Sequence, residues 1–200
     1  MKKYSRIADA ITPLCKGKNS EYANQAAYDA ISIHGGSGFI MEYEAQRLYR
    51  DSRIFSIYEG TTQLQVVAAI RYVTNGTYLK MIEDMLQHEV TEDLKPLQER
   101  VKEMTALYKQ AIEYVKDANN QEMHDFLAYR LCDMTGDILV SLLLIDDATR
   151  NEELFGRSAK VFVFAAKEKV VGHVDYIMNF IAEDLKDFRV KEESQEETEN

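Results

Sequence analysis

The chain has 200 residues, with 34 acidic against 24 basic side chains and a formal net charge of −10. This balance argues against a general nucleic-acid binder, because phosphate binding needs a basic face, although it does not exclude local basic patches. The composition is 46% hydrophobic but includes only 9 glycines and 2 prolines. Such a composition is typical of a soluble globular protein that is built from helices.

The charge is unevenly distributed, since residues 1–76 carry a net +2 and the remainder a net −12. Two regions of different charge indicate two functional parts. Cys15 and Cys132 have no Cys or His partner at metal-ligand spacing, so we expect two buried free thiols in a reducing compartment. No signal-peptide core is visible, and no apolar run reaches the roughly 18 residues of a membrane span. We therefore expect a cytoplasmic protein without membrane association.

The spacing of apolar residues predicts four helices in the first 76 residues. The first is bent or interrupted at Pro13, because proline lacks the N–H that a helix interior requires. Gly35-Gly36 ends the second, since glycine readily takes the left-handed conformation of a helix C-terminus. Thr62 and Gln65 fit a capping box at the start of the fourth. The predicted helices span about 5–14, 20–33, 42–49 and 62–73, with an extended link over 52–58 and a domain boundary at Asn75-Gly76.

Apolar residues at alternating three- and four-residue spacing continue beyond this boundary and predict four further helices, as in a packed bundle. The stretch from Ile138 to Ile145 is apolar nearly all round, so we expect its helix to be central and buried. No segment shows the two-residue period of a strand, and we predict an all-α fold. These helices span about 78–86, 94–115, 122–149 and 153–185, within a domain 77–190 that follows domain 1–76. The remainder, 191–200, is predicted to be a disordered acidic tail with no apolar residue.

Glu59 is the first candidate for chemistry, because it lies on a glycine turn that opens an apolar helix. Taken alone, a glutamate near a helix start is most often a solvated residue that the helix dipole stabilises. However, Gly60 lets backbone approach a ligand closely, and Thr61 and Gln63 offer donors at a helix N-terminus, where phosphate binds well. These neighbours favour a carboxylate that is held against a ligand.

Three segments, in this order and spacing, resemble the C-terminal part of the acyl-CoA dehydrogenase family. They are Gly35-Gly36-Ser37-Gly38-Phe39, Arg50-Asp51-Ser52-Arg53 and Ile57-Tyr58-Glu59-Gly60-Thr61-Thr62-Gln63-Leu64-Gln65. The resemblance is best from Asp29 to Arg71, and residues 77–190 resemble the helical extension of larger bacterial members in position and helical character only. It implies that the chain holds the second half of the family's C-terminal helical bundle plus that extension, while most of the enzyme is absent.

In this family, the glutamate of the Tyr-Glu-Gly-Thr run removes the α-proton of an acyl-CoA thioester, and hydride passes from the β-carbon to N5 of FAD. Because this proton is weakly acidic, the carboxylate must be desolvated, within reach, and paired with donors on the thioester oxygen. The resemblance implies that Glu59 is the base in the intact enzyme, that its backbone N–H is one such donor, and that Gly60 touches the substrate. The chain alone is expected to be inactive.

The same resemblance assigns Thr61 and Gln63 to contacts with FAD, and helix capping by the paired threonines is an alternative that is compatible with it. It places Gly35 and Gly36 against the ADP portion of the flavin, typically that of the neighbouring subunit, although most glycine pairs after a helix are only turns. Many members have Gln where this chain has Ser32. Ser32 cannot make the same reach, so this contact is carried over only as doubtful.

The run Arg50-Asp51-Ser52-Arg53 resembles the family's Arg-Asp-x-Arg, and we expect an ion-pair network that positions the Glu59 loop. The histidines show no convergent ligand spacing, so we predict no metal site. The family implies electron-transfer flavoprotein as redox partner and a homodimer or higher oligomer. The alternative is a helical module for oligomerisation or partner docking without catalysis, with an apolar face left exposed by the missing half-bundle. Acyl-chain length, and the choice between dehydrogenase and oxidase, stay open.

Overall fold

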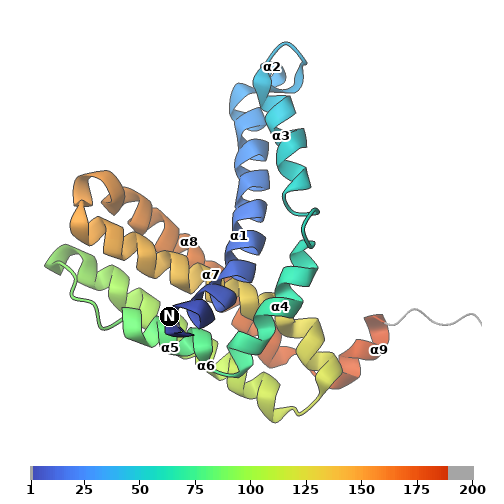
Figure 1. The fold of residues 1–200 in the computed structure, drawn as a ribbon, viewed down its shortest axis with the longest axis vertical. Helices are drawn as coiled ribbons and strands as arrows, with labels where there is room; N and C mark the ends of the chain where they lie inside the picture. Colours follow the sequence, from blue (N-terminus) through green and yellow to red (C-terminus); the bar gives the residue numbers. More distant parts are fainter. Residues whose placement is uncertain (1, 189–200) are drawn as a thin grey trace, which may run out of the picture.

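The computed structural model describes residues 2–188, and every regular element in that range is helical, which confirms the predicted all-α fold. Figure 1 shows an arm, formed by α1 with α2 and α3 folded back along it, standing on a bundle of longer helices. The bounds are α1 Lys2–His34, α2 Gly36–Phe39, α3 Glu44–Ile54, α4 Thr62–Thr74, α5 Thr77–Met85, η1 Glu92–Leu94, α6 Lys95–Asp117, α7 Gln121–Arg150, α8 Glu152–Asn179, η2 Ala182–Asp184 and α9 Leu185–Phe188.

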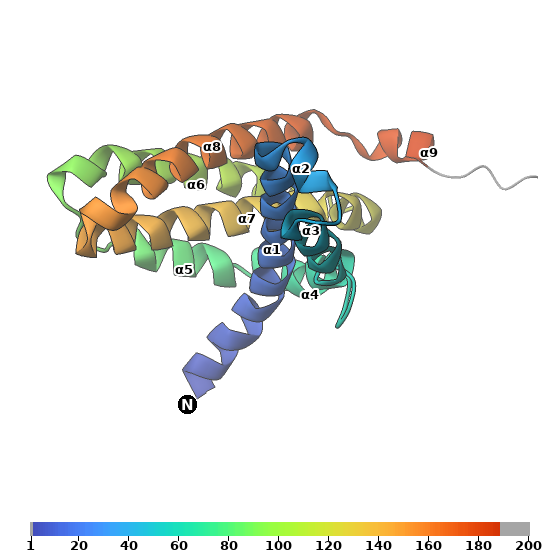
Figure 2. The ribbon, with the colours of Figure 1, turned by 90° about the horizontal axis from the view of Figure 1, so that it is seen from above.

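Helix α1 continues through Pro13, so the predicted interruption at this residue, and the gap before residue 20, are wrong. A proline inside a helix costs about 3 kcal/mol through a lost hydrogen bond and a clash. Tertiary packing offsets this cost, because Pro13, Leu14 and Gly17 are buried on a helix that packs against α4 and α7. The helix still changes direction in its N-terminal part (Figures 1 and 2), as proline-containing helices do.

The tip of the arm follows the prediction, whereas the link after α3 does not. Gly35 has a φ of 60° and a ψ of −142°, a backbone conformation that favours glycine, and α1 ends just before it. A Cβ at Gly38 would lie 2.7 Å from the carbonyl oxygen of Ile31, so only glycine permits this close return of the chain. Helix α3 continues to Ile54, so the predicted extended link over 52–58 is wrong: it is helix as far as Ile54 and turns thereafter.

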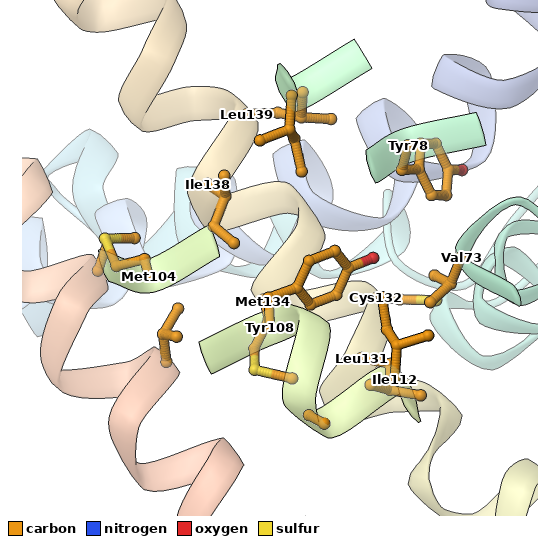
Figure 3. Close-up of a cluster of buried hydrophobic side chains, with 14 of the residues drawn as sticks. Val73, Tyr78, Met104, Tyr108, Ile112, Leu131, Cys132, Met134, Ile138 and Leu139 are labelled. Carbon is orange, nitrogen blue, oxygen red and sulfur yellow. The ribbon is translucent and has the colours of Figure 1, made fainter. Parts of the chain in front are cut away.

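Helix α7 is the centre of the bundle, as predicted from its apolar stretch, with α4, α5, α6 and α8 packed around it. Of that stretch, Ile138 and Ile145 are buried and Leu143 is exposed. The core is continuous with the arm, since the hydroxyl of the buried Tyr78 donates to the carbonyl of Ala10 on α1 (2.6 Å). Figure 3 shows part of this core, with side chains from several helices: Val73, Tyr78, Met104, Tyr108, Met134 and Ile138.

Helix α8 ends at Asn179, so its predicted continuation to residue 185 is wrong. Aromatic packing is the reason: the extended Phe180 stacks on Phe126, with ring centroids 5.0 Å apart, and its carbonyl accepts a hydrogen bond from the Tyr114 hydroxyl (2.7 Å). The predicted tail, 191–200, lies outside the described residues. None of the helices in residues 2–188 has the length and apolarity required to cross a membrane.

Candidate active site

The turn between α3 and α4 holds Glu59 in an unusual backbone conformation. The N–H of Thr62 donates to the carbonyl of Ser56 (3.2 Å) and closes the turn. Within it, Glu59 has a φ of 53° and Gly60 a φ of 93°. A positive φ is uncommon for a residue other than glycine, and such strained residues concentrate at active sites and ligand clamps. Glu59 and Asn119 are the two residues other than glycine with a positive φ in the described part of the chain, and only Glu59 belongs to the sequence motif.

Two side chains fix the peptide groups of this turn. Lys16 of α1 donates through Nζ to the carbonyl of Gly60 (2.5 Å), and Gln65 of α4 donates through Nε2 to the carbonyls of Glu59 and Gly60 (3.3 Å each). Both carbonyl oxygens are thereby occupied. By contrast, the backbone N–H of Glu59 has no hydrogen-bond acceptor anywhere in residues 2–188. One residue thus offers a free carboxylate and a free backbone donor.

A cleft of about 640 Å³ separates this turn from the N-terminal half of α1. Glu59, Tyr58 and Phe55 line one side of it, and Ile11 and Cys15 line the other. Cys15 is exposed, so its predicted burial is wrong, while Cys132 is buried and both thiols are free. Apolar walls beside a carboxylate and a free N–H are suited to removing a proton from carbon next to a carbonyl group, with the N–H stabilising the charge on oxygen.

Helix α4 begins next to the turn and leaves its N-terminus accessible. Thr61 is the N-cap, because its Oγ1 accepts a hydrogen bond from the backbone N–H three residues on (3.4 Å). The predicted capping box of Thr62 and Gln65 is therefore wrong, and the Thr62 hydroxyl donates to Glu21 instead (2.6 Å). Gln63 is exposed, and in the described part of the chain its backbone N–H has no acceptor. This end of α4 suits an anionic or polar ligand group.

The other predicted cofactor residues lie at the far end of the arm (Figure 1). Gly35 and Gly36 are exposed, and a Cβ at either would meet no atom within 4 Å. The Ser32 hydroxyl donates to the carbonyl of Tyr28 on its own helix (3.3 Å). From Lys16 to Gly35 the helix rises roughly 28 Å at 1.5 Å per residue. The structure thus groups Glu59, Gly60, Thr61 and Gln63, but it does not bring Ser32, Gly35 and Gly36 to them within one chain.

The expected ion-pair network after α3 is wrong. Arg53 donates to the hydroxyl of Ser56, and in residues 2–188 none of Arg50, Asp51 and Arg53 forms an ion pair. All three are exposed, and exposed pairs contribute little to stability. The carbonyl of Ser52 accepts a hydrogen bond from Asn24 of α1 (3.3 Å). A neutral hydrogen bond, with packing against α1, therefore holds the end of α3.

A partly buried polar cluster joins the arm to the bundle, and sequence reasoning missed it. Lys18 of α1 forms ion pairs with Asp133 and Asp137 of α7, the latter at 2.7 Å. Tyr22 donates to Asp137 (2.8 Å), and Nε2 of His173 on α8 lies 3.0 Å from Asp133. The available signal was two aspartates four residues apart on a helix that the sequence predicts to be central and buried. Lys18 falls in the gap between the predicted helices 5–14 and 20–33, so the sequence alone did not place it against α7.

The electrostatics of this cluster follow from burial opposed by pairing. Burial alone would raise the pKa of Asp133, but hydrogen bonding from His173 and the charge of Lys18 lower it to about 2. For Lys18, burial lowers the pKa, yet the carboxylates of Asp137 and Asp133 outweigh burial and hold it above its ordinary value. Burial and Asp137 together raise the pKa of Tyr22. The cluster is therefore a charged attachment between three helices.

Two family models cover most of the chain. The model described as "Acyl-CoA dehydrogenase C terminal" matches residues 74–185, and the model "Acyl-CoA dehydrogenase, C-terminal domain" matches residues 3–73. The first match alone exceeds half of the chain. The chain belongs to the acyl-CoA dehydrogenase family, which confirms the resemblance found in its motifs.

Known relatives agree with this assignment. The caffeyl-CoA reductase-Etf complex subunit CarC of Acetobacterium woodii is 48% identical over 61 residues, which are 30% of this chain and 15% of that protein. An acyl-CoA dehydrogenase family protein of Porphyromonas gingivalis has a solved structure with 33% identity and a TM-score of 0.54, covering 57% of this chain and 98% of that one. The FAD complex of a Bacillus anthracis acyl-CoA dehydrogenase covers 88% of this chain and 34% of that one, with 20% identity and a TM-score of 0.66.

Proposed function

We propose that this chain supplies the catalytic base of a flavoprotein acyl-CoA dehydrogenase, which catalyses α,β-dehydrogenation of acyl-CoA thioesters. The observation that carries the proposal is the conformation of Glu59, a non-glycine residue with a φ of 53° beside an open cleft. Its backbone N–H is free. Lys16 donates to the carbonyl of Gly60, and Gln65 donates to the carbonyl of Glu59. Membership of the family supports the same assignment.

In this mechanism the Glu59 carboxylate removes the α-proton of the thioester. The thioester oxygen gains negative charge as the proton leaves, and the backbone N–H of Glu59 donates a hydrogen bond to it. Gly60 has no side chain, so the substrate can approach the backbone closely. Lys16 and Gln65 hold the turn in place while the proton is transferred, so that the carboxylate and the N–H keep their relative positions.

The residues present fit a flavin at the N-terminus of α4. Thr61 and Gln63 would contact it, because the exposed Gln63 has a free backbone N–H there. FAD, when bound, supplies the acceptor for the hydride of the β-carbon. Gly35 and Gly36 have open space around them at the far end of the arm. We assign them, with Ser32 as an uncertain neighbour, to a flavin that another subunit holds, so the functional enzyme would be an oligomer.

The redox partner is proposed to be an electron-transfer flavoprotein. The relative from Acetobacterium woodii is described as a subunit of a reductase-Etf complex, which supports both this partner and an acyl-CoA substrate class. A reductase and a dehydrogenase act on the same pair of carbon atoms in opposite directions. The redox partner that takes electrons from the flavin, or supplies electrons to it, therefore decides the direction of net flux.

We also propose that the 200-residue chain is inactive by itself. The chain spans 15% of the relative from Acetobacterium woodii and 34% of the Bacillus anthracis structure. In this chain Glu59 is exposed and its cleft is open to solvent. Abstraction of a weakly acidic proton requires a base in a site that excludes water. Further protein surface must cover Glu59 before it can act.

The test is Glu59→Gln in the full natural protein that contains this chain. The variant keeps the shape of the side chain but removes the base, so we expect turnover of acyl-CoA to fall by roughly 10²- to 10⁴-fold. FAD content should be unchanged. Glu42→Gln, at an exposed position on the arm that lines no part of the cleft, is the matched control and should retain full turnover. Near-normal turnover of Glu59→Gln would refute the assignment.

The second candidate is a helical module that mediates assembly without catalysis. It is favoured by the large apolar side chains that the arm and α4 leave exposed: Tyr28, Ile33, Phe39, Met41, Leu48 and Val67. Such a face needs a protein partner. One measurement distinguishes the two candidate functions: acyl-CoA-dependent reduction of a dye by the full natural protein. A module that serves assembly alone would not show this activity.

A further inference from the structure

The outward face of α8 carries an apolar stripe in addition to the buried face of the same helix. Leu154, Val161, Phe164, Val171 and Met178 are between 42% and 65% exposed. Their spacing combines intervals of seven and three residues, as at the a and d positions of heptads. The helix packs its other face on α6 and α7, and Figure 2 shows it along one margin of the bundle, with α5 on the opposite side.

Three charged residues complete this heptad pattern. Positions a are Leu154, Val161, Glu168 and Asp175, and positions d are Arg157, Phe164, Val171 and Met178. Parallel pairing with a second copy would place Arg157 beside Arg157 and Asp175 beside Asp175. Charges of the same sign in such positions are unfavourable, and the charge pattern of a helix pair selects its orientation.

Antiparallel pairing makes the stripe complementary to itself. With a two-fold axis at the level of residue 166, Leu154 faces Met178 of the second copy and Val161 faces Val171. Arg157 then faces Asp175, and the symmetry repeats each of these pairs. Apolar residues thus meet apolar residues, and the cation meets the anion. A surface that is complementary to itself about a two-fold axis is what an isologous dimer requires.

The same arrangement accounts for the one mixed pair, in which Phe164 faces Glu168 of the second copy. The guanidinium of Arg100 on α6 lies 3.9 Å from the centroid of the Phe164 ring. A carboxylate brought to Phe164 would therefore meet a cation that is already in place. Across residues 2–188, neither Arg157 nor Glu168 has a hydrogen-bond or ion-pair partner, so both charges are available.

The flanks of the stripe allow two helices to approach. Ser158, Ala165 and Gly172 are small and exposed along one side, and a Cβ at Gly172 would meet no atom within 4 Å. Small residues permit a short distance between helix axes. On the other side, Lys167 would approach Lys167 of the second copy, but an ion pair with Glu103 of its own chain neutralises it.

We propose that α8 is the interface of a symmetric dimer, in which two copies of this chain pair antiparallel through the stripe from Leu154 to Met178. The proposal rests on α8 and Arg100 alone, so it stands whether or not Glu59 is a catalytic base. The apolar pairs supply the attraction, and the pairs between Arg157 and Asp175 set direction and register.

The first test measures the mass of the complete 200-residue chain by sedimentation velocity over a range of concentrations. We expect a monomer–dimer equilibrium, and Val161→Glu should shift it to monomer by placing a charge in the centre of the stripe. Leu143→Glu is the matched control, because Leu143 on α7 is 54% exposed against 64% for Val161, and it should leave the dimer intact. Circular dichroism confirms folding of both variants. A chain that is monomeric throughout, or a dimer insensitive to Val161→Glu, would overturn the proposal.

The second test exploits the symmetry of the charge pairs. Arg157→Glu creates two Glu–Asp contacts and Asp175→Arg creates two Arg–Arg contacts, so each variant alone should dimerise roughly tenfold more weakly. In an equimolar mixture of the two variants, both contacts become cation–anion pairs again and the dimer should reappear. Lys80→Glu, the same change of charge on the exposed Lys80 of α5, should have no effect. Failure of the mixture to restore a dimer would contradict the antiparallel register.

Discussion

The backbone conformation of single residues decides whether the Glu59 turn can offer its carboxylate and its backbone N–H to a ligand. Gly60 has a φ of 93°, and a Cβ at this position would lie 2.7 Å from Nε2 of Gln65, which donates to two carbonyls of the turn. We predict that Gly60→Ala lowers the free energy of unfolding by about 1–3 kcal/mol, through backbone strain and displacement of Gln65. Gly36→Ala is the control with no atom within 4 Å of its Cβ, and urea unfolding should show a change below about 0.5 kcal/mol. Equal effects of the two substitutions would remove the argument for a clamped turn.

The residues of the candidate site divide into those that a motif marks and those that only the fold reveals. Glu59, Gly60, Thr61 and Gln63 are consecutive or nearly so, and a turn followed by a helix start brings them together in any fold. Lys16 is 44 positions away from the carbonyl that it binds. Its role depends on the path of α1, and the prediction placed a break in the helix just before it. Sequence patterns report local geometry, whereas contacts of this kind require the tertiary arrangement.

The ion pairs between α1 and α7 make an element-scale prediction about pH. The pKa of Asp133 is about 2, below its ordinary value of 3.8. A carboxyl group whose pKa is depressed by folding stabilises the protein above its unfolded pKa, and this stabilisation disappears as the pH falls toward the folded pKa. The difference of 1.8 corresponds to about 2 kcal/mol. Between pH 5 and pH 2, the unfolding free energy of the natural chain should therefore fall by about 2 kcal/mol more than that of Asp133→Asn.

Urea unfolding of both proteins at several pH values measures this difference. Glu89→Gln, which removes an exposed acid that lines no cluster, should show the same dependence on pH as the natural chain. If the unfolding free energy of Asp133→Asn fell with pH as steeply as that of the natural chain, the cluster would not carry the attachment of the arm to the bundle.

At the scale of elements, the existence and class of the helices could be predicted, but several of their ends could not. Local chemistry set the ends of α1 at Gly35 and of α4 near Asn75 and Gly76, where Gly76 is left-handed. The continuity of α1 through Pro13 depends on burial against other helices, which no local pattern encodes. The early end of α8 depends likewise on the stacking of Phe180 against Phe126, a residue of another helix.

At the scale of the whole molecule, the arm keeps the two groups of predicted flavin contacts apart. Thr61 and Gln63 lie at its base and Gly35 and Gly36 at its tip (Figure 1). We predict that titrating the purified chain with FAD leaves flavin fluorescence unchanged at micromolar concentrations, because each end offers only a few exposed contacts and binding must first offset at least about 4 kcal/mol of lost freedom. The full natural protein is the positive control, and with it Gly35→Val should reduce FAD content if the tip serves a flavin of another subunit. Saturable binding by the chain alone would show that a complete flavin site forms within it or between its copies. Comparing the two single variants Gln63→Ala and Gly35→Val would then identify which end of the arm builds that site.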